Sequence, residues 1–262
     1  METTIIQGQE KELSPVNEAN LPILEEMTKA GLFMGKKSSK THPRMKSMTY
    51  GTRNGIEIID LEETLVLLEK AMAFVTKKVS EKGTLLIVGT TPAAKDSVEV
   101  FAKKMKLLHV VERWLGGTLT NFKTLSKRIA YFKKLKSDRE AGRLEKYTKK
   151  ERLGFDRTII KMTTMFSGIE NMEDVPSILF VIDVKANDTA VREAKILRIP
   201  VIGVLNTDTN PTTIEYPIPA NDRSKMSIDW VLARLEKAIE AGRAVATTAA
   251  AHVATKGTIV QS

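Results

Sequence analysis

Runs of apolar residues alternate along the chain with segments whose apolar positions recur every three or four residues. Residues 93–105 and 188–198 have this helical spacing, and each lies between two apolar runs. The alternation gives two β-α-β units, which predict an α/β fold with a doubly wound parallel sheet of about five strands. The runs, which are typical of strands buried on both faces, cover residues 84–90, 107–111, 177–183 and 201–205.

Further helices are expected on either side of these units. A short helix is predicted between Asn20, which can cap it, and Gly31, which can end it in the left-handed conformation. A last helix is predicted over residues 227–242. A long helix is predicted from apolar positions that fall on one stripe, namely Leu61, Leu65, Leu68, Met72, Val75 and Val79.

The segment between the two units predicts an antiparallel helical hairpin with its tip over residues 137–147. Thr148 and Glu151 match a capping box, so the second helix is expected to begin there. The first helix has a narrow apolar stripe made of Phe122, Leu125, Ile129, Phe132 and Leu135. The apolar residues of the second helix can face this stripe in a coiled coil, and they are Ile159, Met162, Met165, Phe166 and Ile169.

These elements divide the chain into a body, an insertion and two tails. Residues 21–117 and 173–243 are expected to form the α/β domain, and residues 118–172 to insert into it as the coiled-coil hairpin. Residues 1–20 are expected to form a flexible tail. Residues 244–262 are rich in Ala and Thr without an apolar period, so a disordered tail is expected there.

The composition excludes several classes of protein. Cysteine is absent, which excludes disulfides, thiolate zinc sites and a cysteine nucleophile. The first residues lack the basic start and apolar centre of a secretory signal, so no export is expected. The apolar runs are far shorter than the roughly 20 residues that span a bilayer, so no membrane partner is expected.

Positive charge is concentrated in the hairpin. The chain has a net charge of +9, yet residues 113–161 alone carry +10, because 15 basic residues there face 5 acidic ones. No acidic residue occurs from Lys123 to Lys136, whereas a helix stabilised by its own surface pairs mixes both signs. Such a helix is expected to lie against phosphates, with a solvated helix face as the alternative.

A second basic segment precedes the α/β units. Its Lys and Arg residues are interleaved with Ser, Thr, Gly and Pro, which is typical of a loop that follows a nucleic-acid backbone. A flexible solvated loop is equally compatible with this pattern. Aromatic residues make up only 5% of the chain, so recognition of folded RNA by phosphate and shape is favoured over base stacking on a sheet.

Residues 113–122 (RWLGGTLTNF) form the most unusual segment. Its adjacent glycines permit a tight turn or a close approach, and Thr118 or Thr120 can cap the basic helix, whose start would also attract phosphate. Alternatively, Trp114 anchors the hairpin to the sheet and the glycines only reverse the chain. The residues leave both interpretations open.

Motifs for catalysis or metal binding are weak. Residues 89–96 (GTTPAAKD) nearly fit the Walker A pattern, but Ala94 replaces its second glycine and Asp96 its Ser or Thr. The added methyl obstructs a phosphate cradle, and the carboxylate repels phosphate. The three histidines lie far apart, without the spacing of a zinc site. His109, beside a predicted strand, is expected to be structural.

Three functional classes are compatible with these residues. An RNA-binding scaffold explains the concentrated charge. A phosphosugar or nucleotide enzyme would use Asp183, Asn206 and Asp208, which follow strand ends where doubly wound folds place ligands, although turn and cap roles are favoured. A coiled-coil adaptor would bind a protein partner through the apolar stripes of the hairpin.

Several segments resemble ribosomal protein S2 of bacterial-type small subunits. The long matches are RNGIEIIDL (53–61), RWLGGTLTNF (113–122), ILFVID (178–183) and IPAND (218–222). Shorter matches, Glu193-Ala194 among them, extend the resemblance from about Leu24 to Arg243. The resemblance implies a flavodoxin-like domain with a coiled-coil insertion, acting in the cytoplasm as a structural part of the small ribosomal subunit and not as an enzyme. Its implied partners are small-subunit rRNA near the junction of head and body and neighbouring ribosomal proteins, S1 among them.

The chain also departs from this family. The family's GVHFGH opening appears as GLFMGK (31–36), so both histidines are missing, and Arg223 stands where an acidic residue is common. We therefore expect no metal, and likewise no cofactor, no small-molecule substrate and no catalytic residue. RNA contact is expected at Lys36, Lys37, Lys40, Arg44, Lys46, Arg53, Arg113, Trp114, Gly116, Gly117, Thr118, Thr120, Asn121, Lys123, Lys127, Arg128, Lys133 and Lys134.

Overall fold

The computed structural model describes the backbone of residues 20–258 and the side chains of residues 20–248. Apart from Asn20, the predicted N-terminal tail lies outside the described residues. The main sheet has five strands, all paired in parallel, in the order β5-β4-β6-β7-β8. This is the strand order of a flavodoxin-like, doubly wound fold, as the sequence predicted. The strands are β4 (Leu85–Val88), β5 (Leu108–Val110), β6 (Ile178–Ile182), β7 (Val201–Leu205) and β8 (Tyr216–Pro219).

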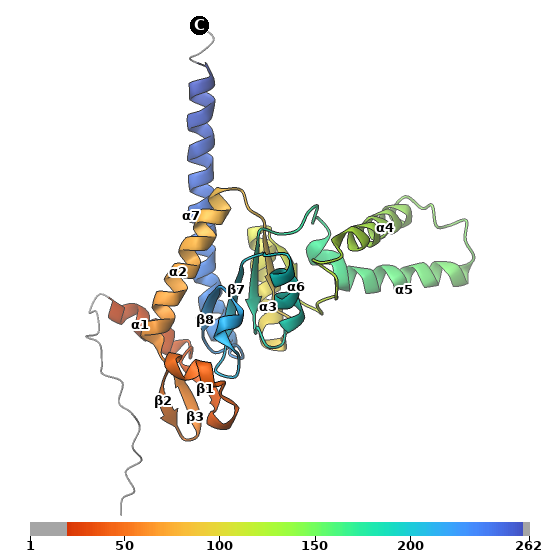
Figure 1. Cartoon of the computed structure of the whole chain (residues 1–262). Coiled ribbons are helices and arrows are strands. Elements are labelled where there is room, and N and C mark those ends of the chain that lie inside the picture. The colour runs from red at the N-terminus through yellow and green to blue at the C-terminus, as the bar shows by residue number, and fades with distance from the viewer. Residues whose placement is uncertain (1–19, 259–262) are drawn as a thin grey trace, which may run out of the picture.

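Alternate residues of the central strands β4, β6 and β7 pack into two apolar cores, one on each face of the sheet. On one face, Leu85 and Ile87 of β4 pack in the core covered by α2, α3 and α7. On the other, Leu86 and Val88 pack beneath α6 and the base of the hairpin. Burial on both faces explains why these strands are continuous apolar runs and do not alternate. The covering helices are α2 (Leu61–Ser80), α3 (Pro92–Met105), α6 (Asp188–Ile196) and α7 (Lys225–Thr258) (Figure 1).

The hairpin consists of α4 (Phe122–Glu140) and α5 (Lys149–Phe166), which project from the α/β body (Figure 1). Ring packing between Phe132 and Phe166 and the predicted capping box at Thr148 hold it together. The caps proposed for the first helix were wrong. That helix begins at Phe122 and no side chain caps it, because Thr118 and Thr120 are hydrogen-bonded elsewhere.

The basic segment expected as a loop forms a small antiparallel sheet instead, of order β1-β3-β2. Asn54 and Gly55 both have positive φ angles, of 51° and 74°, in the turn between β2 and β3. Asn-Gly is the preferred pair for such a two-residue hairpin turn, so the sequence held a signal that our prediction missed. The elements are β1 (Met34–Lys37), η2 (Ser38–Lys40), η3 (Pro43–Met48), β2 (Thr49–Arg53) and β3 (Ile56–Ile59).

Close backbone contact docks this small sheet on the main one. A Cβ at Gly35 of β1 would lie 2.8 Å from Thr207 Cγ2 and 2.6 Å from the Glu57 carbonyl oxygen, so only glycine fits without displacement. The Lys36 amide donates to Thr207 Oγ1 at 3.0 Å, and the His42 amide donates to the Thr207 carbonyl at 2.8 Å. These contacts place the basic segment over the carboxyl end of β7.

The terminal helices follow the prediction at one end of the chain and depart from it at the other. Helix α1 spans Leu21–Lys29 and is followed by Gly31 with φ +73°, as expected, but the Asn20 side chain makes no capping hydrogen bond. Helix α7 passes Gly242 and continues to Thr258, so residues 244–258 are helical where a disordered tail was predicted. Alanine, the strongest helix former, recurs throughout that stretch. Residues 259–262 lie outside the described residues. None of the helices that the structure describes is both long and apolar enough to span a bilayer.

Gly242 lies where α7 packs most closely on α2, which explains a glycine inside a long helix. A Cβ there would lie 2.7 Å from the Thr76 carbonyl oxygen and 2.8 Å from Val79 Cβ.

Gly242→Ala should therefore lower the free energy of unfolding by about 1–3 kcal/mol, because two helices must separate. Gly154→Ala, in exposed α5 with no atom within 4 Å, should raise it by about 0.5–1 kcal/mol. Urea denaturation of both variants tests this, and changes of the same sign in the free energy of unfolding would contradict it.

Candidate nucleic-acid interface

The segment between β5 and α4 wraps around one buried carboxylate, that of Glu193 on α6. Oε1 accepts from the Trp114 indole at 3.0 Å and from the Gly117 amide at 2.8 Å. Oε2 accepts from the Leu119 amide at 3.0 Å and from both the amide and the hydroxyl of Thr120, each at 3.2 Å. Five donors from one segment therefore converge on the two oxygens of a single side chain.

This arrangement keeps the carboxylate charged although it is buried. Burial raises the pKa of Glu193, but the bonds from Trp114 and from the Leu119, Gly117 and Thr120 amides outweigh it, so the net pKa is lowered. The ionised group satisfies the amides of the turn and ties α6 to the root of the hairpin. Of the two interpretations of this segment, the structure supports Trp114 as the anchor.

The same contacts divide the predicted RNA-binding residues of this segment into two groups. The side chains of Trp114 and Thr118 are buried, and Gly117 and Thr120 are engaged with Glu193. The residues at these four positions therefore make contacts inside the protein that stabilise the fold. Arg113, Gly116 and Asn121 are exposed beside the root of the hairpin. Sequence reasoning missed Glu193 itself, although a carboxylate among Ala190, Val191 and Ala194 on the buried face of α6 was an available signal.

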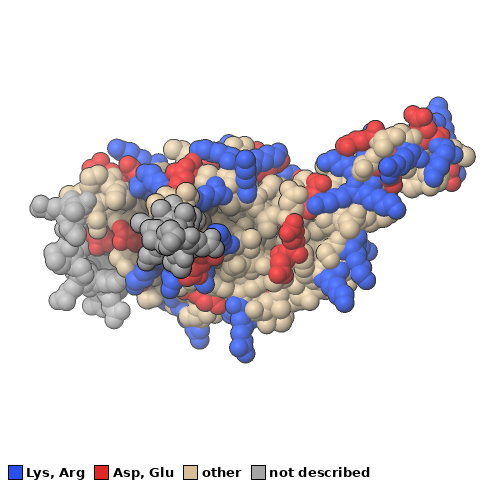
Figure 2. Space-filling view, turned by 90° about the horizontal axis from the view of Figure 1, so that it is seen from above, with Lys and Arg blue, Asp and Glu red and all other residues tan. Residues whose placement is uncertain are grey.

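Lysines form a ridge along the exposed side of α4. The buried residues of this helix recur at three- and four-residue spacing, and Lys123, Lys127 and Lys134 lie on the opposite side. At 1.5 Å per residue the ridge is about 16 Å long. Arg128 and Lys133 are exposed on its flanks. Figure 2 shows Lys and Arg side chains gathered on the projecting hairpin.

Charge pairing separates this ridge from the three basic residues that follow it toward the tip of the hairpin. Lys136 lies 3.9 Å from Glu170, Arg139 lies 3.1 Å from Asp156, and Arg143 lies 2.9 Å from Asp138. Among the residues that the structure describes, no carboxylate lies within ion-pair distance of the five ridge and flank cations. The ridge is therefore an uncompensated positive surface.

The small sheet carries a second exposed basic surface. Lys37, Lys40, Lys46 and Arg53 are exposed, and no carboxylate of the described part of the chain pairs with them. Arg44 is also exposed and donates to Thr212 Oγ1 at 2.6 Å. These residues come from β1, η2, η3 and β2, so the small sheet fixes their relative positions more firmly than a loop would.

Lys36, which the sequence placed in the same basic surface, is engaged inside the protein. Its ammonium lies 2.7 Å from Asp208 and 3.5 Å from Asp222, and its side chain is only 16% exposed. Lys185 pairs with the other oxygen of Asp208 at 2.9 Å. Burial raises the pKa of Asp208, but the bonds from Lys36 and Lys185 lower it by more. The pKa of Asp222 is raised, chiefly by burial and then by the charge of Asp183. Lys36 therefore joins the two sheets, and its ammonium is paired with carboxylates inside the protein.

Two of the three polar residues at the strand ends, Asp183 and Asn206, have the turn roles that the sequence favoured, whereas Asp208 forms ion pairs with Lys36 and Lys185 instead. Asp183 accepts from the Ala186 amide at 2.9 Å, and Asn206 accepts from the Thr207 amide at 2.7 Å. In the near-Walker segment, Lys95 forms an ion pair with Glu112. Within the described residues, no group of histidine and carboxylate side chains is arranged to hold a metal ion. His109 is buried beside Gly168, in line with a structural role.

Comparison with known proteins gives consistent matches over most of the chain. The model of the family described as "Ribosomal protein S2" matches residues 27–242. A relative from Dictyoglomus thermophilum, named small ribosomal subunit protein uS2, is 38% identical over 221 residues, which are 84% of this chain and 90% of the relative. The protein of that name from Coprothermobacter proteolyticus is 38% identical over 84% of this chain and 82% of its own. The protein of that name from Jannaschia sp. is 40% identical over 78% of this chain and 74% of its own.

Replacing the buried carboxylate should destabilise the whole fold. In Glu193→Gln an amide group would face the donors of residues 114–120, so we expect the free energy of unfolding to fall by about 2–4 kcal/mol. Glu140→Gln, an exposed change at the end of α4, is the matched control and should stay within about 0.5 kcal/mol of the parent. Urea denaturation measures both, and equal stability of the two variants would contradict the role assigned to Glu193.

The same carboxylate should give the protein a specific sensitivity to acid. Because the folded pKa of Glu193 is below its ordinary value of 4.5, its ionised form stabilises the fold above that pH. This contribution is lost as the pH falls through the folded pKa. The difference in unfolding free energy between the parent protein and Glu193→Gln should therefore shrink below pH 4.5. A difference that stays constant with pH in denaturation curves would exclude a charged Glu193.

Proposed function

This chain belongs to the ribosomal protein S2 family, and we propose that it binds folded small-subunit rRNA through the lysine ridge of α4 and the basic surface of the small sheet. Members of this family are structural components of the small ribosomal subunit and not enzymes. Partners in that setting are rRNA and other ribosomal proteins. The hypothesis of a phosphosugar or nucleotide enzyme is thereby set aside.

One observation carries the proposal. Lys123, Lys127 and Lys134 form an exposed line without a carboxylate partner in the described structure, whereas Lys136, Arg139 and Arg143, which follow them along the chain, are paired. Like charges at this spacing repel one another, so the free helix bears a cost that a row of phosphates relieves. Binding also releases the cations condensed on RNA, which supplies affinity without base-specific contacts.

The small sheet supplies the second half of the proposed interface. Lys37, Lys40, Arg44, Lys46 and Arg53 lie on elements held by backbone contacts to the main sheet. Arg113, Gly116 and Asn121 lie at the root of the hairpin and extend the contact there. A rigid body with two basic surfaces suits recognition of RNA shape, since their relative position is set before binding.

A second role, contact with neighbouring proteins, has separate support on α5. Leu153 and Ile160 are seven residues apart, lie on one side of the helix, and are 50% and 64% exposed. An exposed apolar pair on a charged hairpin favours a protein partner at that position. We propose that neighbouring small-subunit proteins, S1 among them, contact the chain, and that it acts in the cytoplasm as part of the subunit.

Neutralising the ridge should weaken RNA binding in a salt-dependent way. Lys123→Gln, Lys127→Gln and Lys134→Gln combined should make the slope of log affinity against log salt shallower by about 2–3, because each lost phosphate contact removes about 0.7–0.9. Fluorescence anisotropy with small-subunit rRNA across a salt series measures this.

The control for that experiment carries the same change of charge elsewhere. Lys78, Lys103 and Lys104, on α2 and α3, each pair with a glutamate and lie outside both proposed surfaces. Their combined change to Gln should leave the slope within about 1 of the parent value. If the ridge and control variants shift the slope equally, binding depends on net charge and the proposed interface is wrong.

A further inference from the structure

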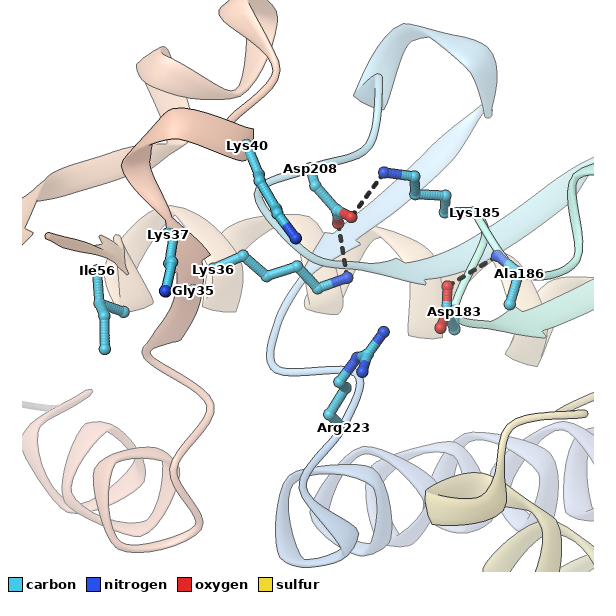
Figure 3. A pocket seen from close by; sticks show the side chains of 10 residues that line it. All are labelled: Gly35, Lys36, Lys37, Lys40, Ile56, Asp183, Lys185, Ala186, Asp208 and Arg223. Carbon is cyan, nitrogen blue, oxygen red and sulfur yellow. Dashed lines mark hydrogen bonds and ion pairs between the residues drawn. The ribbon is translucent and has the colours of Figure 1, made fainter.

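A cleft of about 650 Å³ opens between the small sheet and the carboxyl ends of β6, β7 and β8. In parallel α/β sheets this edge is where ligands bind. Figure 3 shows that Lys40 from the small sheet and Arg223 from the segment after β8 point from opposite sides toward the Lys36 ammonium. The cleft is lined by Gly35, Lys36, Lys37, Lys40, Ile56, Asp183, Lys185, Ala186, Asp208 and Arg223.

The carboxylates in and beside this cleft are largely neutralised by groups already in contact with them. Asp208 pairs with Lys36 at 2.7 Å and with Lys185 at 2.9 Å. Asp222, which lies behind Lys36, is buried and accepts from the Asn206 amide at 3.0 Å. Asp183 is 4% exposed, and one of its oxygens accepts from the Ala186 amide. These acids offer little charge to the space of the cleft.

The remaining cations have no such partners. Lys37, Lys40 and Arg223 are exposed, and no carboxylate of the described residues pairs with them. With the paired ammonium groups of Lys36 and Lys185, they leave the cleft with an excess of positive charge. A cavity with this excess favours an anion over a metal ion, and within the described structure no side-chain group suited to metal binding occurs.

We propose that this cleft binds the phosphate group of a nucleotide. The guanidinium of Arg223 presents a planar pair of donors that matches phosphate oxygens, and Lys40 approaches from the other side as a point charge. The volume is that of a small-molecule site and exceeds what a bare phosphate needs. Ile56, 37% exposed on the wall of the cleft, offers an apolar surface to a sugar or base.

The proposal deepens the proposed function at one point, because Lys37 and Lys40 belong both to the cleft and to the basic surface of the small sheet. The same phosphate chemistry has two sources, a free nucleotide or a terminal nucleotide of an RNA strand. The lysine ridge on α4 plays no part in the cleft. Nucleotide binding and rRNA binding can therefore fail independently of one another.

Isothermal titration calorimetry of the full chain with adenosine 5′-monophosphate tests the site. We expect saturable binding of the monophosphate and at least tenfold weaker binding of adenosine, since only the former carries the anion. Arg223→Gln should weaken binding at least fivefold, because the guanidinium lies in the cleft. Lys103→Gln, which removes the same charge from α3, outside the cleft and both basic surfaces, should leave it unchanged.

Short RNA oligonucleotides with and without a 5′-phosphate distinguish the two sources. Tighter binding of the phosphorylated strand than of the monophosphate, lost in Arg223→Gln, assigns the cleft to RNA; tighter binding of the monophosphate assigns it to a free nucleotide. The proposal is overturned if adenosine binds as well as the monophosphate, if neither binds, or if Arg223→Gln and Lys103→Gln act alike. In each of those cases the salt dependence of rRNA binding still reports separately on the ridge.

Discussion

The hydrogen bonds to the carboxylate of Glu193 fix the position of the segment that leads from β5 into the hairpin. A buried ionised group is stable only where donors surround it, and here all five donors come from the turn that leads into the hairpin. The turn is held to α6 and thereby to the main sheet. The direction in which α4 leaves the body, and with it the direction of the lysine ridge, depends on this contact. The most unusual sequence segment therefore supports the proposed RNA-binding surface, and only its exposed residues are available to extend that surface.

Electrostatics then divides the molecule into neutralised and uncompensated regions. Inside the protein, Lys36 and the carboxylates at the strand ends balance one another and join the small sheet to the large one. Near the tip of the hairpin, ion pairs such as that of Arg139 with Asp156 link its two helices. The cations of the lysine ridge and the exposed cations of the small sheet pair with no carboxylate among the described residues. This distribution is unfavourable in an isolated chain and becomes favourable against a polyanion.

The fold could be predicted from the sequence where burial determines the pattern. Strand β7 was placed residue for residue, and α2, α4 and α5 follow the predicted apolar stripes. The small sheet was missed because its strands are short and two of them, β1 and β2, are largely polar, although Asn54-Gly55 marked its turn. The extent of α7 was underestimated because Gly242 was interpreted as a helix end, whereas it is there for close contact with Thr76 and Val79. Local sequence does not show which distant backbone a glycine approaches.

The candidate interface was less predictable, because exposure depends on tertiary contacts. Charge counting identified α4 correctly as an exposed basic helix, but it could not separate Lys36, which is engaged with Asp208, from Lys37 beside it. The central claim is that the outer side of α4 lies against rRNA. A photo-crosslinking amino acid at Ala130, between Lys127 and Lys134, tests this in assembled small subunits. The account predicts crosslinks to rRNA, and efficient crosslinking to protein alone, or to nothing, would contradict it.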